Sequence, residues 1–105
     1  MNALEFIQSL GSKVNPEAIA GHNTVFHFEI EGDGGGQKTV QVVDGKLEVL
    51  DGLVGESKCT VKVKGDTLMK IVKGDENAMM AFMMGKIKVS NPGELMKYSK
   101  IFGLM

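Results

Sequence analysis

Four short segments of this chain alternate apolar and polar side chains, which is the pattern of β-strands that bury one face. The first begins at Thr24 and points Phe26, Phe28 and Ile30 to one side. The others cover residues 38–43, 46–50 and 59–64. A β-sheet is therefore expected at the centre of the fold.

Glycine-rich turns join the first three of these strands. The run from Gly32 through Asp33 to Gly36 supplies positions that tolerate positive φ, and Asp44-Gly45 is the strongest short turn signal in the chain. The three strands should therefore form an antiparallel meander, with residues 59–64 adding a fourth strand.

Two helical segments precede the sheet. Asn2 and Glu5 match a capping box, and apolar residues then recur at helical spacing as far as Val14. Asn15 and Pro16 repeat the start signal, but a glycine five residues later predicts that the second helix is short.

The second half of the chain returns to helical periodicity at Gly65. Asp66 is expected to cap a helix that ends at Gly74, and Asp75 to cap a methionine-rich helix that ends at Gly85. A fifth strand over residues 86–90 should follow.

The last helix has a complete start signal. Asn91, Pro92 and Glu94 stand as cap, first-turn proline and first-turn acid, and the apolar residues Leu95, Met96, Ile101 and Phe102 predict a helix from Pro92 to Phe102.

Helices and strands are segregated along the chain, so the fold class should be α+β. We expect one domain over residues 1–105, with about five mainly antiparallel strands and helices on one face of the sheet. The methionine-rich helix and the last helix should cover the face that carries Phe26, Phe28, Val40, Val42 and Val61. An apolar cavity is expected between those helices and the sheet.

Composition excludes several classes of protein. The 105 residues include 12 Lys and 13 Asp or Glu, a net charge of -1, which gives no overall attraction to nucleic acid. Cys59 is the single cysteine, so the sequence fits a reducing compartment. No apolar run reaches the ~18 residues of a membrane span, and the N-terminal segment has no basic flank. A cytoplasmic location is expected.

No catalytic, metal or cofactor motif is visible. The glycine run fails as a dinucleotide fingerprint, because an alternating strand follows it instead of a helix. His22 and His27 stand in no nucleophile or metal-ligand pattern, and His27 should lie on the surface beside Glu29. Cys59 is expected to be an inward-facing small apolar residue. The sequence therefore predicts a protein that is not an enzyme and holds neither metal nor cofactor.

The segment from Asn77 to Val89, NAMMAFMMGKIKV, holds four of the eight methionines. Methionine is unbranched and polarizable, so a wall built from it adapts to contents of variable shape. That favours a soft pocket, although ordinary core packing is an alternative reading of the helix. A Cu(I) site is a weaker alternative, because the segment lacks His and Cys.

Residues 65–105 form the more basic part of the chain, with six Lys against four acids, whereas residues 1–64 carry six Lys and nine acids. These lysines could meet a lipid carboxylate or headgroup, although solvated surface lysines would give the same count. They are Lys70, Lys73, Lys86, Lys88, Lys97 and Lys100.

Four motifs stand in succession along the chain: Phe26-x-Phe28-x-Ile30-x-Gly32-Asp33-Gly34-Gly35, Asp44-Gly45-Lys46, Thr60-Val61-x-Val63 and Ala81-Phe82-Met83-x-Gly85-Lys86-Ile87-Lys88-Val89. Together they resemble the motifs of the sterol carrier protein-2 family. The resemblance implies a five-stranded sheet and helices that enclose an apolar tunnel for fatty acids, acyl-CoA, sterols or phospholipids.

Two departures from the family pattern stand near the C-terminus. Gly103-Leu104-Met105 does not match the peroxisomal tripeptide of some relatives, so a bacterial or archaeal cytosolic source is expected. After the last strand this chain has Ser90-Asn91-Pro92-Gly93, where many members of the family have Gly-Asp or Gly-Asn. The tunnel is therefore expected to be shallower or more open at that end.

The resulting hypothesis is non-catalytic binding and transfer of lipid in a tunnel, with transient contact to a membrane surface and no nucleic-acid partner. The expected lining is Phe26, Phe28, Val40, Val42, Leu68, Ile71, Met79, Met80, Phe82, Met83, Ile87, Met96, Ile101 and Phe102. The rival hypothesis is an interaction module or accessory domain whose methionine-rich groove receives a partner helix. The sequence predicts neither the physiological lipid nor the oligomeric state.

Overall fold

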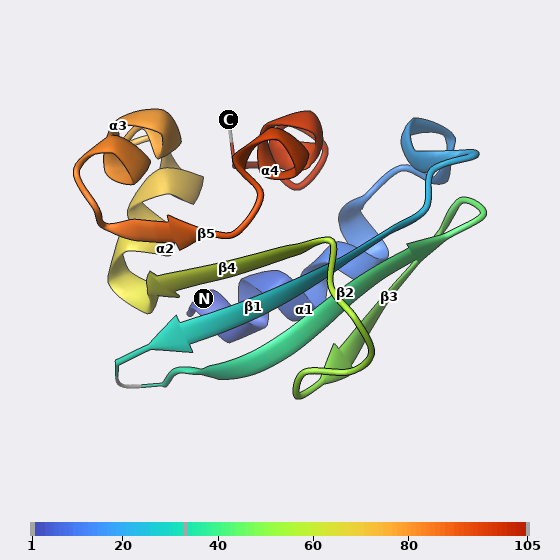
Figure 1. Cartoon of the computed structure of the whole chain (residues 1–105), viewed down its shortest axis with the longest axis horizontal. Coiled ribbons are helices and arrows are strands. Elements are labelled where there is room, and N and C mark those ends of the chain that lie inside the picture. The colour runs from blue at the N-terminus through green and yellow to red at the C-terminus, as the bar shows by residue number, and fades with distance from the viewer. Residues whose placement is uncertain (1, 33, 105) are drawn as a thin grey trace.

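Five strands form one sheet in the order β3-β2-β1-β4-β5 (Figure 1). The computed structural model describes residues 2–32 and 34–104, so Asp33 of the first predicted turn and Met105 lie outside the described residues. The strands are β1 (Thr24–Glu31), β2 (Gly36–Val43), β3 (Lys46–Asp51), β4 (Cys59–Lys64) and β5 (Ile87–Val89).

The sheet is mixed but mainly antiparallel. β1, β2 and β3 pair as the predicted antiparallel meander, and β5 pairs antiparallel with β4. β4 lies parallel to β1 on its other side, with Phe26 opposite Cys59 and Phe28 opposite Val61. A parallel neighbour requires a crossover connection, which the segment 52–58 supplies. The predicted α+β class is confirmed.

The helices are α1 (Ala3–Lys13), the 3₁₀ helix η1 (Pro16–Ile19), α2 (Gly65–Lys73), α3 (Ala78–Met83) and α4 (Pro92–Ser99). Asn2 and Glu5 form the predicted capping box of α1. The predicted caps of the next two α-helices were wrong. α2 begins at Gly65 with no side-chain cap, and Asn77, rather than Asp75, accepts hydrogen bonds from the first turn of α3.

Glycine ends the three later helices in the same way. Gly74, Gly85 and Gly103 all have positive φ. At each, the glycine N–H and the following N–H donate to carbonyls of the last turn, as in a Schellman motif. The predicted end of the last helix at Phe102 lies beyond the observed Ser99, because residues 100–103 form a hydrogen-bonded turn that continues the helix and ends at Gly103.

All four α-helices cover one face of the sheet. Lys38, on the same face as its cross-strand neighbour Phe28, donates a hydrogen bond to Gln8 of α1, which fixes the side on which α1 lies. α1 packs on β2 and β3, whereas α2 and α4 contact β4, and α3 contacts β5. The expectation that α3 and α4 cover Val40 and Val42 was therefore wrong, because α1 occupies that half.

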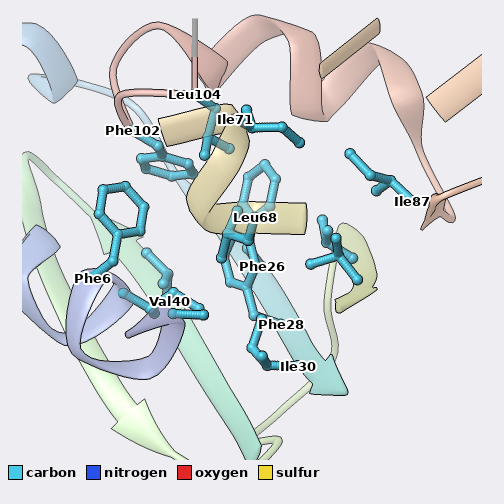
Figure 2. Close-up of a cluster of buried hydrophobic side chains, with 14 of the residues drawn as sticks. Phe6, Phe26, Phe28, Ile30, Val40, Leu68, Ile71, Ile87, Phe102 and Leu104 are labelled. Atoms are coloured by element: carbon cyan, nitrogen blue, oxygen red, sulfur yellow. The ribbon is translucent and has the colours of Figure 1, made fainter. Parts of the chain in front are cut away.

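The core lies between this helical layer and the sheet. Figure 2 shows side chains from α1, α2, the central strands and the C-terminal segment converging in one cluster. Phe26 is fully buried and packs edge-on against Tyr98 and Phe102, with ring centroids 5.8 Å and 5.2 Å away. These contacts attach the C-terminal segment to the central strand.

The opposite face carries the crossover 52–58, which passes in front of the central strands in Figure 1. Thr39 holds this segment by accepting a hydrogen bond from the Val54 N–H and donating one to the Gly52 carbonyl, at 2.9 Å and 2.8 Å. His27 Nε2 lies 2.9 Å from the Val54 carbonyl, and only 9% of His27 is exposed. The predicted surface position of His27 was wrong, because the crossover covers it.

Candidate functional site

A cavity of about 470 Å³ lies among the end of α2, α3, β5 and α4. Most of its wall is apolar. It is lined by Ile71, Gly74, Glu76, Asn77, Ala78, Met79, Phe82, Val89, Pro92, Leu95, Met96, Ser99 and Leu104. Its size is within the range of about 300–1,000 Å³ that is usual for small-molecule sites.

α3 forms one wall, and Asn77 caps its N-terminus. The Asn77 side chain accepts from the Met79 and Met80 N–H groups at 2.8 Å and 3.2 Å. Met79 and Phe82, three residues apart, lie on one side of the helix and line the cavity. Met79 is 42% exposed, so it stands at the rim.

α4 forms the facing wall through Leu95, Met96 and Ser99. Met96 is 53% exposed and lies at the rim opposite Met79. Leu104, which follows the last turn, is 7% exposed and closes the inner end toward the core.

Polar contacts attach α4 to the start of β1. Thr24 Oγ1 donates to Glu94 Oε2 at 2.6 Å, and His22 Nδ1 lies 3.1 Å from the Tyr98 hydroxyl. Burial, together with the nearby Glu94 carboxylate, raises the pKa of Tyr98, so its hydroxyl stays protonated at neutral pH. α4 is therefore held at several points on the side that faces the sheet.

Among residues 2–32 and 34–104, Glu76 is the one ionisable residue in the lining, and no lysine of this part of the chain lines the cavity. Lys86 Nζ lies 2.6 Å from Glu76 Oε1, so the carboxylate is neutralised by an ion pair at the wall. The described residues thus give the cavity a mainly apolar surface and no free cation. Its chemistry suits the apolar part of a ligand.

Four of the predicted lining residues border this cavity: Ile71, Met79, Phe82 and Met96. Seven others are buried and do not line it: Phe26, Phe28, Val40, Val42, Leu68, Ile87 and Phe102. Ile101 is partly buried against that core. Met80 and Met83 are 58% and 77% exposed on the outer side of α3. Whether any of these residues contacts a ligand stays a prediction.

Sequence reasoning missed part of the lining. Leu95 and Val89 were recognised as apolar residues of a helix and a strand, but their position at the cavity depends on how β5 and α4 meet. Ala78 and Pro92 line it as the first residues of their helices. The start signals of α3 and α4 could have indicated both.

The structure places Cys59 in the core, as predicted for an inward-facing small apolar residue. Cys59 is fully buried, its thiol lies 3.5 Å from the Asn91 carbonyl, and burial raises the pKa of that thiol. Within residues 2–32 and 34–104, no group of three or more His, Cys, Asp or Glu side chains could hold a metal ion. No helix in the same part of the chain is long and apolar enough to cross a membrane.

Several solved structures share this fold. Palmitated SCP2L2 from Aedes aegypti aligns with a TM-score of 0.72 at 22% identity, covering 95% of this chain and 90% of that one. The sec-alkylsulfatase Pisa1 from Pseudomonas sp. aligns with a TM-score of 0.73 at 23% identity, covering 91% of this chain but 15% of that chain. The fold thus occurs both as most of a small protein and as part of a much larger one.

Curated relatives and a family model identify the sequence. Sterol carrier protein 2 from Oryctolagus cuniculus and from Bos taurus is 31% identical over 81 residues, or 73% of this chain. The match spans 15% of the length of those relatives. The model of the SCP-2 sterol transfer family matches residues 4–103. This chain therefore belongs to the SCP-2 sterol transfer family, as its motifs predicted.

Proposed function

We propose that this protein binds a lipid in the cavity bordered by α2, α3 and α4 and carries it without catalysing a reaction on it. The observation that carries the proposal is the cavity itself, whose described lining is mainly apolar and in which the Glu76 carboxylate is paired with Lys86. Membership of a lipid-binding family agrees with that chemistry. The protein would act in the cytoplasm.

Affinity would come from burial of apolar area. Each methylene removed from water contributes about 0.8 kcal/mol, and the cost of immobilising the ligand offsets part of the total. Such attraction has no directional requirement, and the methionines at the rim adapt to different shapes. Fatty acids, acyl-CoA, sterols and phospholipids are therefore all candidate ligands, and their polar groups would stay at the rim.

A partner helix seated between α3 and α4 is the rival occupant. Native mass spectrometry of protein purified without detergent distinguishes the two. Bound mass in the lipid range supports the proposal. A chain that carries no bound lipid and binds only amphipathic peptides would support the rival.

Filling the cavity tests the proposal directly. Leu95→Trp places a larger side chain at the lining, and Leu53→Trp makes the same change in the crossover, on the other face of the sheet. We expect Leu95→Trp to weaken binding of a fluorescent fatty acid by about tenfold, equivalent to about 1.4 kcal/mol. Leu53→Trp should bind as the wild type does. Equal affinity in all three proteins, each with an unchanged melting temperature, would contradict binding in this cavity.

A further inference from the structure

The apolar cavity has a polar corner, which Glu76 and Asn77 form at the start of α3. Among the described residues, the polar side chains that line the cavity are those of Glu76, Asn77 and Ser99. The Ser99 hydroxyl donates to the Met96 carbonyl of its own helix at 3.1 Å, so it is directed along α4. The head group of a lipid held in the cavity would therefore meet Glu76 and Asn77.

Backbone hydrogen bonds position both members of the Glu76–Lys86 ion pair. The Glu76 N–H donates to the Lys70 carbonyl at 3.2 Å, at the end of α2. The Lys86 N–H donates to the Ala81 carbonyl at 2.8 Å, at the end of α3. The Glu76 side chain is 16% exposed and lines the cavity, whereas that of Lys86 is 45% exposed and does not. The carboxylate thus borders the cavity, and the ammonium group lies behind it.

Asn77 adds a hydrogen-bond donor beside this carboxylate. Its side-chain oxygen accepts from the Met79 and Met80 N–H groups, so its NH2 group is turned away from the helix backbone. The corner therefore combines an acceptor, the Glu76 carboxylate, with a donor, the Asn77 amide. A hydroxyl group can donate to the first and accept from the second, whereas a carboxylate can only accept.

A carboxylate head group would also repel Glu76. The ammonium group of Lys86 lies 2.6 Å from Glu76 Oε1 and is already paired there. Two carboxylates that share one ammonium group repel each other, and the repulsion grows where the protein excludes water. The ion pair thus neutralises Glu76 without leaving a counter-ion for a ligand.

We propose that the Glu76–Lys86 pair, together with the Asn77 amide, makes the cavity select lipids with an uncharged hydroxyl head group over lipids with a carboxylate. The inference rests on the proposed function, since it concerns the head group of a lipid held in the same cavity. Two ligands of equal chain length bury the same apolar area, so the selection between them comes from the head group. Both classes bind, and the carboxylate binds less tightly.

Isothermal titration calorimetry with decanol and decanoate, which have the same chain length, tests the inference. It is done at a pH at which decanoate is ionised and at concentrations below micelle formation. The wild type should bind decanol about tenfold more tightly than decanoate. Glu76→Gln keeps an acceptor but removes the negative charge and frees Lys86. It should therefore bind decanoate about tenfold more tightly than the wild type does, and decanol about equally.

Lys86→Met makes the opposite change, because it leaves Glu76 without its cation. Its affinity for decanoate should fall severalfold below that of the wild type, while its affinity for decanol changes little. The two substitutions therefore move the preference in opposite directions, which a general loss of packing around α3 would not do.

Matched controls carry the same chemical changes outside the cavity. Asp75→Asn removes the exposed carboxylate that precedes Glu76 in the chain, and Lys62→Met removes an exposed lysine of β4. Both should keep the preference of the wild type for decanol. Melting temperatures check that all four variants fold.

Two outcomes would overturn the inference alone, provided that Leu95→Trp weakens binding of both ligands. One is a wild type that binds decanoate as tightly as decanol, or more tightly. The other is the same preference in Glu76→Gln as in Asp75→Asn, because the selection would then not depend on Glu76. If neither ligand binds the wild type, or if Leu95→Trp binds both as the wild type does, the proposed function fails and the inference fails with it.

Discussion

Individual polar side chains in this protein take their roles from partners far away in the sequence. Lys38 lies on the face of the sheet that carries the core, and it reaches both Gln8 of α1 and Asp51 of β3. Asp51 is the cross-strand neighbour of Lys38, so strand register alone brings the two charges together. The hydrogen bond and charge of Lys38 lower the pKa of Asp51.

This pair predicts a measurable pH dependence. In Lys38→Met, the pKa of Asp51 should rise to the ordinary value for an aspartate, because its cation is gone. Since the folded pKa is lowered, the contribution of the pair to stability is present above the unfolded pKa of Asp51 and is lost as pH falls through the folded pKa. NMR titration of the carboxyl carbon measures the shift. The same low pKa in Lys38→Met as in wild type, with Lys46→Met as control, would contradict the pairing.

At the scale of the elements, asparagine caps set where the helices begin. Asn2 caps α1, on the half of the sheet away from the cavity, and Asn77 caps α3, which forms a cavity wall. Replacing either by alanine should cost about 1 kcal/mol of stability. Only Asn77→Ala should also weaken lipid binding, severalfold, because it loosens the wall at Met79.

Chemical denaturation and lipid titration of the two cap variants measure these effects side by side. Equal lipid affinity in Asn2→Ala and Asn77→Ala, at matched stability, would show that the start of α3 does not shape the binding site.

Local sequence signals were sufficient to predict most elements. Alternation placed the strands, and glycine ended the later helices where it can adopt positive φ. The errors had two sources. Asp75 and Asn77 both have the chemistry of a cap and stand close together, and Asn77 is the one that accepts hydrogen bonds from the first turn of α3. His27 alternates outward yet is covered by the crossover, a tertiary contact that the spacing of neighbouring residues does not encode.

The cavity was harder to predict than the fold. A soft pocket beside the methionine helix follows from composition, and Met79 and Phe82 do line a cavity. Its other wall depends on β4 lying parallel to β1, which carries β5 and α4 to that side of the sheet. Since no local pattern gives strand order, Val40 was assigned to a lining that α1 instead covers.

In the molecule as a whole, the helices form two groups that contact different strands of the sheet. α1 covers β2 and β3 and contributes to the core, while α2, α3 and α4 gather around β4 and β5 (Figure 1). The cavity lies in the second group, so its walls are short helices that rest on a small part of the sheet.

The central claim is that lipid occupies the cavity between α3 and α4, and methyl NMR with a spin-labelled fatty acid tests it most directly. In protein labelled at its methionine methyl groups, the signals of Met79 and Met96 should broaden first, because these residues form the two rims. Signals of Met83 and Met84, on the outer side of α3, should be affected less at ligand concentrations below micelle formation. Uniform broadening of all four signals, or none at Met79 and Met96, would contradict the proposed site.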